Sequence, residues 1–504
     1  MNSPSSPWFN SPGSANDQWD HFEQLVVIDH ADFFDDVSPI AGARAPGRLD
    51  VMGGVADYSG SMVLEMPLAE AACVAWQWRT DRKLRVRSLL KGASAGEFLS
   101  AVFSLDDLLT SDGYLRTPSE VHQRLTGNVE TRWAAYIVGC YYVMLSAYTQ
   151  FSQGKVDSRV GELGANILLS SSVPLGAGVS SSAAIEVATM HALNEAAGIH
   201  PSDMTLAAWC QRVENTIVGA PCGIMDQVTS ALGLEDNLLV LQCQPHNLIG
   251  YQRTPPGWKF VGIDSRVKHS VGGSAYTEAR VGAFMGLKII QLESGGKPKQ
   301  NYLCQLSHEE FSAYSDLVPE VVTGEEFGRL YGILPDTVTS VDLETTYYPR
   351  ACAEHPILEN ERVKHLFGMM QIASARHIEN SAPLDSGGLA SRPDVEILLR
   401  AGKLMYAAHE SYSQRLKLGS PETDLIVKLV ANRGSAMGLY GAKITGGGAG
   451  GTVAILCDAT CGDYELALQQ VCSEYHRQTG VSPTTFCGSS PGAVSFGARH
   501  IIRG

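Results

Sequence analysis

The 504-residue chain has no run of about 18 apolar residues, roughly the length that a helix needs to cross a bilayer. The segment 1–20 is rich in Ser, Pro and Asn and lacks the apolar stretch of a secretory signal peptide. The 11 cysteines are scattered and never spaced as Cys-x-x-Cys, so the sequence indicates neither a zinc site nor a disulfide framework. We therefore expect a cytoplasmic protein with reduced thiols and no membrane partner.

Basic residues are also scarce. Lys and Arg number 38 against 53 Asp and Glu, which gives a net charge of −15. This balance argues against a nucleic-acid partner, although a small anionic ligand needs only a local positive site. With 44% hydrophobic and 18% charged residues, the composition is typical of a globular protein, and the length favours two domains.

One stretch, Val173–Ala184, combines glycines with three consecutive serines. It lacks the Gly-Lys-Ser/Thr ending of a Walker A loop, and serines occupy the last positions of a dinucleotide fingerprint. The apolar run Ile167–Leu169 before it predicts a strand, and apolar residues at helical spacing after it predict a helix that ends at Gly198. Free N–H groups and the helix dipole favour an anion at such a loop. The stretch suggests a polyphosphate cradle, although Gly/Ser loops before helices are also common without a ligand.

Hydrophobic patterns and Gly/Pro breaks predict the other elements. Residues 1–39 are expected to form a partly disordered extension with a short helix at Phe22–Phe34. Strands are predicted in 43–68 on both sides of a glycine-rich turn, and at Ala71–Trp78, Lys83–Ser88, Leu238–Leu241, Phe260–Asp264 and Thr452–Leu456. Helices are predicted at Trp133–Tyr148, around 206–217, within Cys222–Leu232, and at Val395–Ser413 and Thr423–Gly434.

Four motifs, in order, resemble the GHMP kinase superfamily and, within it, the galactokinase family. They are Pro46-Gly47-Arg48 with Asp57-Tyr58, the central Gly/Ser stretch, Cys222–Gln227, and the late loop Gly446–Gly451. The resemblance covers about 43–500, apart from an enlarged region at about 291–350. It implies an α+β fold with two GHMP kinase domains, 40–258 and 259–504, and an active site in the cleft between them. It also implies transfer of the γ-phosphoryl group of ATP to the anomeric hydroxyl of a sugar.

The same resemblance assigns the reacting groups. Asp226 matches the catalytic aspartate, which would accept or orient the proton of the sugar hydroxyl. Arg48 matches the arginine beside it, which would stabilise charge on the transferring phosphoryl group. Glu214 and Ser182 match the pair that binds Mg²⁺. Taken alone, Asp226 would also suit the role of a helix-capping aspartate, and Arg48 that of a partner in a surface ion pair. Glu214 alone would also suit the role of a solvated glutamate on a helix.

The remaining ligand contacts follow from the motifs in the same way. The resemblance implies ATP contacts at Pro174, Gly176, Gly178, Ser180, Ser181, Ser182, Ala183 and Trp133, although ordinary core packing would explain Trp133 equally well. Sugar contacts are implied at Asp57, Gly54, Val55, Tyr276 and Gly447. One carboxylate such as Asp57 accepts from two neighbouring hydroxyls. The sugar contacts also allow plainer interpretations, as turn residues or a partly buried tyrosine.

The first motif departs from the galactokinase pattern at two positions. Galactokinases carry Gly-Glu-His-Thr-Asp-Tyr, whereas this chain has Gly53-Gly54-Val55-Ala56-Asp57-Tyr58. The resemblance places the missing Glu and His at the C6 hydroxymethyl end of the sugar. An unpaired hydroxyl buried there would cost about 1–3 kcal/mol, so a galactose-like sugar without C6 is favoured. That sugar is L-arabinose, and the motif is similar to the kinase portion of L-arabinokinases.

Three alternatives remain. A galactokinase activity is the nearest, and a uronic-acid kinase is less favoured because the first motif adds no basic residue for a carboxylate. A non-catalytic sensor that binds sugar and ATP is a second class, disfavoured because Ser180–Ala184 and Asp226 are intact. A dehydrogenase would need a Rossmann fingerprint between a strand and a helix, and none is seen. The expected ligands are ATP, Mg²⁺ and a small-molecule sugar, and the oligomeric state stays open.

Overall fold

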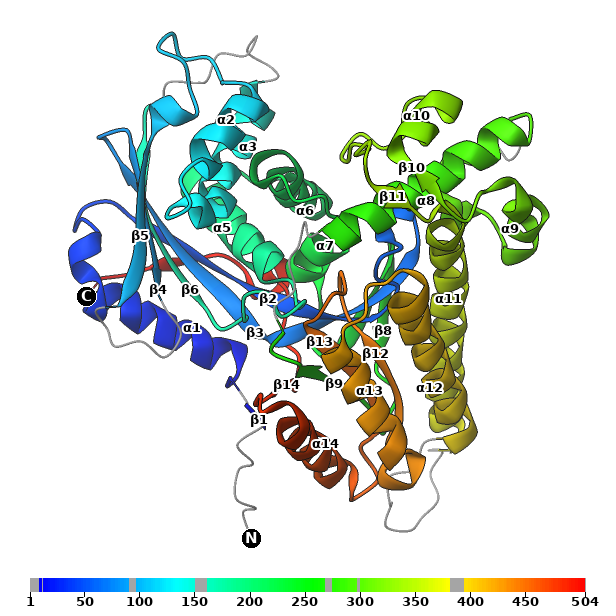
Figure 1. Ribbon diagram of the computed structural model, residues 1–504. Helices are drawn as coiled ribbons and strands as arrows, with labels where there is room; N and C mark the ends of the chain where they lie inside the picture. Colours follow the sequence, from blue (N-terminus) through cyan, green and yellow to red (C-terminus); the bar gives the residue numbers. More distant parts are fainter. Residues whose placement is uncertain are drawn as a thin grey trace.

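The computed structural model describes residues 9–10, 12–89, 97–149, 161–267, 274–296, 300–380 and 394–503. Two larger β-sheets make up its strand framework, and helices pack against both (Figure 1). The α+β class expected from the sequence is confirmed. Within the described ranges, every helix is too short or too polar to cross a membrane. All 11 cysteines are free.

The first sheet is built on two long antiparallel strands, β2 and β3, which are buried over most of their length. Its strand order is β15-β2-β3-β6-β4-β5, and β7 and β8 extend it beside the first residues of β3. Within this sheet the β4–β6 pair is parallel. The strands are β2 Ile40–Met52, β3 Met62–Arg79, β4 Lys83–Leu89, β5 Phe98–Ser104, β6 Gly164–Ser171, β7 Asn237–Gln242, β8 Asn247–Arg253 and β15 Arg499–Ile501.

Helices cover the two faces of this sheet unequally. Alternate residues of β3 enter different cores, since Val74 and Trp76 belong to the main core and Cys73 and Ala75 to a smaller one under α1. On the main face, α5 and α7 lie directly on β2 and β3. The helices are α1 Ala15–Gln24 on the smaller core, and α2 Pro118–Thr126, η5 Arg132–Ala134, α3 Ala135–Thr149, α5 Ser181–Ala197, α6 Asp203–Arg212, η6 Val213–Val218 and α7 Met225–Leu232 on the main one.

The second sheet has the strand order β1-β14-β9-β13-β12. Helices α13 and α14 share a core with its strands, whereas α12 packs on β12 and buries its apolar residues in the main core. The elements are β1 Phe9–Asn10, β9 Trp258–Asp264, β12 Leu439–Ile444, β13 Thr452–Asp458, β14 Thr484–Phe486, α12 Val395–Glu410, α13 Pro421–Arg433 and α14 Tyr464–Thr479. The chain ends cross over, because β1 joins this sheet and β15 joins the first. The domain limits 40–258 and 259–504 stay a prediction.

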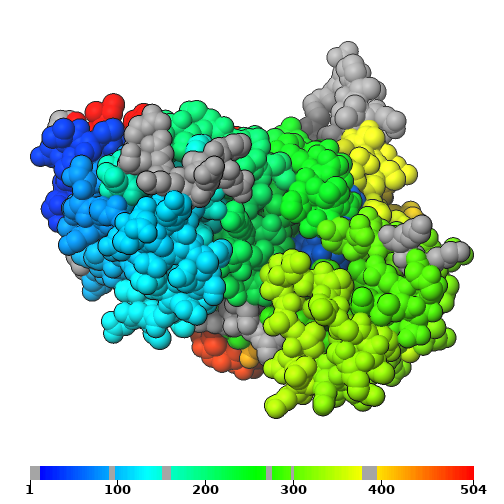
Figure 2. Space-filling view, turned by 90° about the horizontal axis from the view of Figure 1, so that it is seen from above, coloured from blue at the N-terminus to red at the C-terminus, as the bar shows by residue number. Residues whose placement is uncertain are grey.

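The enlarged region expected at 291–350 lies within a helical lobe with its own core. In Figure 2 a recess separates this yellow-green lobe from the cyan lobe around residues 100–150. That core reaches back to Val55, Tyr58 and Tyr276 of the sugar-contact motifs. The elements are α8 Ser274–Glu293, α9 His308–Tyr314, β10 Val322–Thr323, α10 Gly324–Tyr331, β11 Thr346–Tyr347 and α11 Pro349–Asn380.

Two expectations from the sequence change at their boundaries. The strand predicted at Ala71–Trp78 is confirmed as a strand, but it is the second half of β3, which runs on from Met62. The N-terminal helix predicted at Phe22–Phe34 begins earlier, at Ala15, because Ser14 and Asp17 form a capping box. It continues through a π-helical turn at Leu25–Asp29. The part of the extension at 1–8 and residue 11 lie outside the described residues.

Candidate active site

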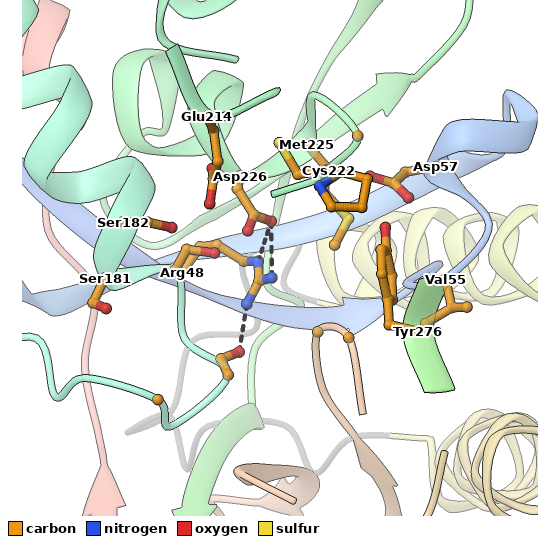
Figure 3. Close-up of a pocket in the computed structure, with 17 residues that line it drawn as sticks. Arg48, Val55, Asp57, Ser181, Ser182, Glu214, Cys222, Met225, Asp226 and Tyr276 are labelled. Atoms are coloured by element: carbon orange, nitrogen blue, oxygen red, sulfur yellow. Dashed lines mark hydrogen bonds and ion pairs between the residues drawn. The ribbon is translucent and has the colours of Figure 1, made fainter. Parts of the chain in front are cut away.

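A pocket of roughly 670 Å³, part of it open to solvent, lies where β2, α5, α7 and the loop after β12 meet. In Figure 3, Ser181, Ser182 and Glu214 lie toward one end and Val55 and Tyr276 toward the other, with the Arg48–Asp226 pair between them. The lining residues are Arg48, Val55, Asp57, Gly176, Gly178, Ser180, Ser181, Ser182, Glu214, Pro221, Cys222, Gly223, Met225, Asp226, Tyr276, Gly446 and Gly447.

The Gly/Ser loop joins β6 to the N-terminus of α5. Its two lining glycines, Gly176 and Gly178, have φ of 74° and 72°, a region that disfavours other residues. Ser180 begins α5 in the left-handed conformation, and in the described structure its side chain caps none of the first-turn amides. Ser180, Ser181 and Ser182 at this helix N-terminus line the pocket, so an anion bound there would be favoured by the helix dipole.

Arg48 is fixed on β2 between two loops. Its Nε and Nη2 lie 2.9 and 2.8 Å from Asp226 Oδ1, and its Nη1 donates to the carbonyl of Gly178 at 2.7 Å. Arg48 is 2% exposed, whereas the side chain of Asp226 is 21% exposed. Burial acts to lower the pKa of Arg48, but the neighbouring carboxylates, Asp226 first, outweigh it and hold that pKa above its ordinary value. The guanidinium is therefore a permanent cation that orients the accessible carboxylate of Asp226.

Glu65 on β3 lies behind this pair and was not predicted. Its Oε2 is 3.3 Å from Arg48 Nε, and the residue is fully buried. Burial, followed by the charge of Asp50, raises the pKa of Glu65 well above its ordinary value, while Arg48 opposes the shift. When Glu65 is neutral, Asp226 is the carboxylate that balances the positive charge of Arg48.

Asp57 depends on a glycine for its position. A Cβ on Gly223 would lie 1.6 Å from Asp57 Oδ2, so no other residue fits there without moving the carboxylate. Burial, and then the charge of Asp226, raises the pKa of Asp57 to about 6. Its Oδ1 accepts from the Tyr58 N–H at 2.9 Å, so Oδ2 is the oxygen beside Gly223.

Glu214 enters the pocket from a π-helical turn, Val213–Val218, that continues α6. Such turns often re-aim a side chain at functional sites. The Nε2 of Gln227 lies 2.7 Å from Glu214 Oε2 and 3.3 Å from Glu186 Oε2. Burial, and then the charge of Asp226, raises the pKa of Glu214 to about 7, while hydrogen bonds led by that of Ser182 oppose the shift. Near pH 7 the Glu214 side chain is therefore divided between its neutral and ionised forms, and a bound cation would favour the ionised form.

A divalent cation would fit between Ser182 and Glu214. No group of three or more His, Cys, Asp or Glu side chains within metal-binding range occurs in the described ranges. Mg²⁺ does not require one, because it keeps several waters and takes one or two protein oxygens together with phosphate oxygens. A hydroxyl and a buried carboxylate at the anion cradle are a suitable donor set.

At the end of the pocket opposite Ser182 and Glu214, Val55 and Gly54 differ in whether they line the pocket. Val55 lines the pocket with φ of 55°, a strained conformation for a β-branched residue. Gly54 is buried and is not among the lining residues. A Cβ on Gly54 would lie 2.2 Å from Tyr412 Oη and 2.3 Å from Asp50 Oδ2, so other groups already fill this space.

Four predicted residues lie outside the pocket wall. Besides Gly54 these are Pro174, which precedes the lining glycines, and Ala183, which is fully buried in α5. Trp133 packs against the main core, which fits the alternative interpretation given above. The other predicted residues all line the pocket, and their roles stay predictions.

Five further residues line the pocket, namely Pro221, Cys222, Gly223, Met225 and Gly446. Four of them lie within the Cys222–Gln227 motif or the late loop, and Pro221 directly precedes that motif, so the motifs indicated this region although no contact was assigned to these residues one by one. Gln227 also belongs to the Cys222–Gln227 motif, whereas Glu65 had no such signal, because its importance comes from contacts between distant segments.

Comparison with known proteins gives three results. A family model described as the GHMP kinases N terminal domain matches residues 135–234. An L-arabinokinase of Arabidopsis thaliana is 37% identical over 92% of this chain, and the chain spans 47% of that relative's length. A galactokinase of a Roseiflexus strain is 27% identical over 90% of this chain and 93% of its own length.

Among solved structures, a Lactococcus lactis galactokinase complexed with galactose superimposes with a TM-score of 0.69. The match covers 94% of this chain and 99% of the galactokinase at 19% identity, and it shows the fold.

Proposed function

We propose that the chain is a kinase of the GHMP superfamily, an ATP-dependent sugar 1-kinase that converts L-arabinose to L-arabinose 1-phosphate and ADP. The observation that carries the kinase proposal is the pair of buried Arg48 and accessible Asp226 beside the N-terminus of α5. A phosphate cradle, a fixed cation and an accessible carboxylate are the groups that phosphoryl transfer needs. The cytoplasmic location remains a prediction.

The reaction follows from these positions. The phosphates of ATP bind at the amides of the Gly/Ser loop and the first turn of α5. Asp226 orients the anomeric hydroxyl and takes its proton as the oxygen bonds to the γ-phosphorus and the bond to ADP breaks. Arg48 stabilises the charge on the transferring group. Mg²⁺ held at Ser182 and Glu214 would neutralise the β- and γ-phosphate oxygens.

The choice of L-arabinose rests on the C6 end of the sugar site. Val55 supplies an apolar wall there, and Tyr412 and Asp50 fill the space beside Gly54. A hydroxymethyl group would meet this wall without the Glu and His that the galactokinase motif carries, whereas a pentose has no C6. The 37% identity to an L-arabinokinase supports the same choice.

D-Galactose is the second candidate, because several relatives are galactokinases. Initial rates with ATP·Mg²⁺ against L-arabinose, D-galactose, glucuronate and N-acetylgalactosamine test the proposal. Turnover of L-arabinose with the highest kcat/KM supports it, and a higher value for D-galactose refutes the C6 argument. Binding of sugar and ATP without turnover would indicate the sensor.

A further inference from the structure

Two residues beyond Arg48, strand β2 carries a second buried charge, Asp50. Its Oδ2 lies 2.9 Å from Lys443 Nζ of β12, and both side chains are 0% exposed. Neither residue lines the pocket, and neither was predicted from the sequence. The pair joins a central strand of the first sheet to the edge strand of the second.

Asp50 also binds the loop that follows β12. Its Oδ2 accepts from the Gly446 N–H at 3.2 Å, and its own N–H donates to Thr445 Oγ1 at 2.9 Å. One residue of β2 thus contacts both Thr445, which directly precedes the late loop, and Gly446, its first residue. The next residue, Gly447, lines the pocket.

Tyr412 also contacts the late loop and Lys443. Its hydroxyl donates to the Gly446 carbonyl at 3.2 Å, and Lys443 Nζ lies 5.3 Å from the centre of its ring. The same hydroxyl and Asp50 Oδ2 occupy the space beside Gly54. The Tyr412 hydroxyl and the Asp50 carboxylate therefore lie against both the late loop and the segment that leads into Val55.

We propose that Asp50, Lys443 and Tyr412 are positioning residues that hold Gly446 and Gly447 in the pocket wall beside Arg48 and so set sugar affinity. The proposal rests on the proposed function for its kinetic part. A buried ion pair adds little net stability over apolar residues of the same shape, so its value here is geometric. Asp50 fixes the peptide group before Gly446 through its N–H, and Tyr412 fixes the peptide group after it through the Gly446 carbonyl.

The test compares Lys443→Met and Tyr412→Phe with Arg44→Met in the full-length protein. Arg44 is a matched control because, like Lys443, it is a fully buried cation, and it lies on β2, the strand that carries Asp50. It donates to the Ala69 carbonyl and to Ser490 Oγ, both at 3.0 Å, and is not a pocket residue. Amide hydrogen exchange of Thr445–Gly451 and the KM values for sugar and ATP are measured for each variant.

We expect Lys443→Met to speed exchange of the late loop at least tenfold and to raise the KM for the sugar at least tenfold. The KM for ATP should change less than threefold, because the Gly/Ser loop keeps its own contacts. Tyr412→Phe removes a single hydroxyl, so it should fold and shift both loop exchange and sugar KM in the same direction by at least threefold.

Loop exchange and sugar KM in Lys443→Met and Tyr412→Phe that match those of Arg44→Met would overturn the proposal. If Lys443→Met does not fold, Tyr412→Phe decides alone. If the wild-type protein phosphorylates no sugar, the proposed function fails, and the exchange data still decide whether these residues hold the loop.

Discussion

The guanidinium of Arg48 is the group on which the proposed chemistry most depends. It contacts a carboxylate of α7 and a carbonyl of the Gly/Ser loop at the same time. Any sugar hydroxyl that reaches Asp226 is thus held near the anion cradle. The geometry makes Asp226 the accessible member of a pair whose other member is buried.

Asp226→Asn should lower kcat about 10²–10⁴-fold, because the amide neither accepts the proton nor balances Arg48. Binding of a non-hydrolysable ATP analogue, measured by calorimetry, should change less than threefold. Asp203→Asn is the matched control, since Asp203 also lies in the first turn of a helix but is not a pocket residue. Unchanged turnover in Asp226→Asn would remove the residue from the mechanism.

The pKa of Glu214 predicts a pH-dependent metal requirement. Its folded pKa is raised to about 7, so below that pH a proton competes with the cation for the carboxylate. We expect the apparent Mg²⁺ affinity, titrated kinetically at saturating ATP, to fall about tenfold per pH unit below 7 and to level off above it. Glu214→Gln should abolish this slope, and a slope retained in that variant would exclude Glu214 as the metal ligand.

Gly223→Ala should displace the carboxylate of Asp57, because the added Cβ would lie 1.6 Å from Oδ2. We expect at least a tenfold rise in the KM for the sugar with little change in the KM for ATP. Gly328→Ala is a suitable control, since nothing lies within 4 Å of its Cβ position in α10. In that helix the substitution should be neutral or stabilising by about 0.5–1 kcal/mol. Equal sugar KM values in both variants would contradict the assigned role of Asp57.

At the scale of elements, strand β3 shows why one continuous strand was predicted as two. A proline inside a strand usually argues against that strand, and Pro67 divides this one. The structure pairs Pro67 with Arg48 next to a register shift between Pro46 and Arg48. A bulge at this point tolerates the missing N–H, and it aims Arg48 into the pocket. Strands were predicted up to residue 68 and again at Ala71–Trp78, so only the continuity of β3 through residues 69–70 was missed.

Helix α1 should contribute stability and not catalysis. Trp19 is 2% exposed and packs in the small core over β2 and β3, apart from the pocket. Trp19→Ala should lower the free energy of unfolding by about 3–5 kcal/mol, measured by urea unfolding, and leave the kinetic constants of folded protein unchanged. His21→Ala, on the exposed side of α1, should have little effect. Altered kinetic constants in Trp19→Ala would connect the extension to the site.

At the scale of the whole molecule, the order of the motifs predicted the α+β fold and most of the pocket, since each motif is a local turn or helix start with its own chemistry. Contacts between distant segments were beyond it. Glu65, Lys443 and Tyr412 have no local signal, because Glu65 meets the first motif across the β2–β3 pair, and Lys443 and Tyr412 meet it only when β12 and the turn after α12 pack against β2. The ion pair between Arg280 and Asp336, at 2.7 Å, likewise joins segments that are far apart in the sequence. It connects the enlarged region to the pocket helix α8, and no sequence pattern indicates it.

The most direct test of the central claim is the ratio of kcat/KM for L-arabinose to that for D-galactose, measured with ATP·Mg²⁺ on the full-length protein. The apolar wall at Val55 and the filled space beside Gly54 predict a ratio of at least about five, since an unpaired hydroxyl costs roughly 1–3 kcal/mol. A ratio below one would contradict the account of the sugar site.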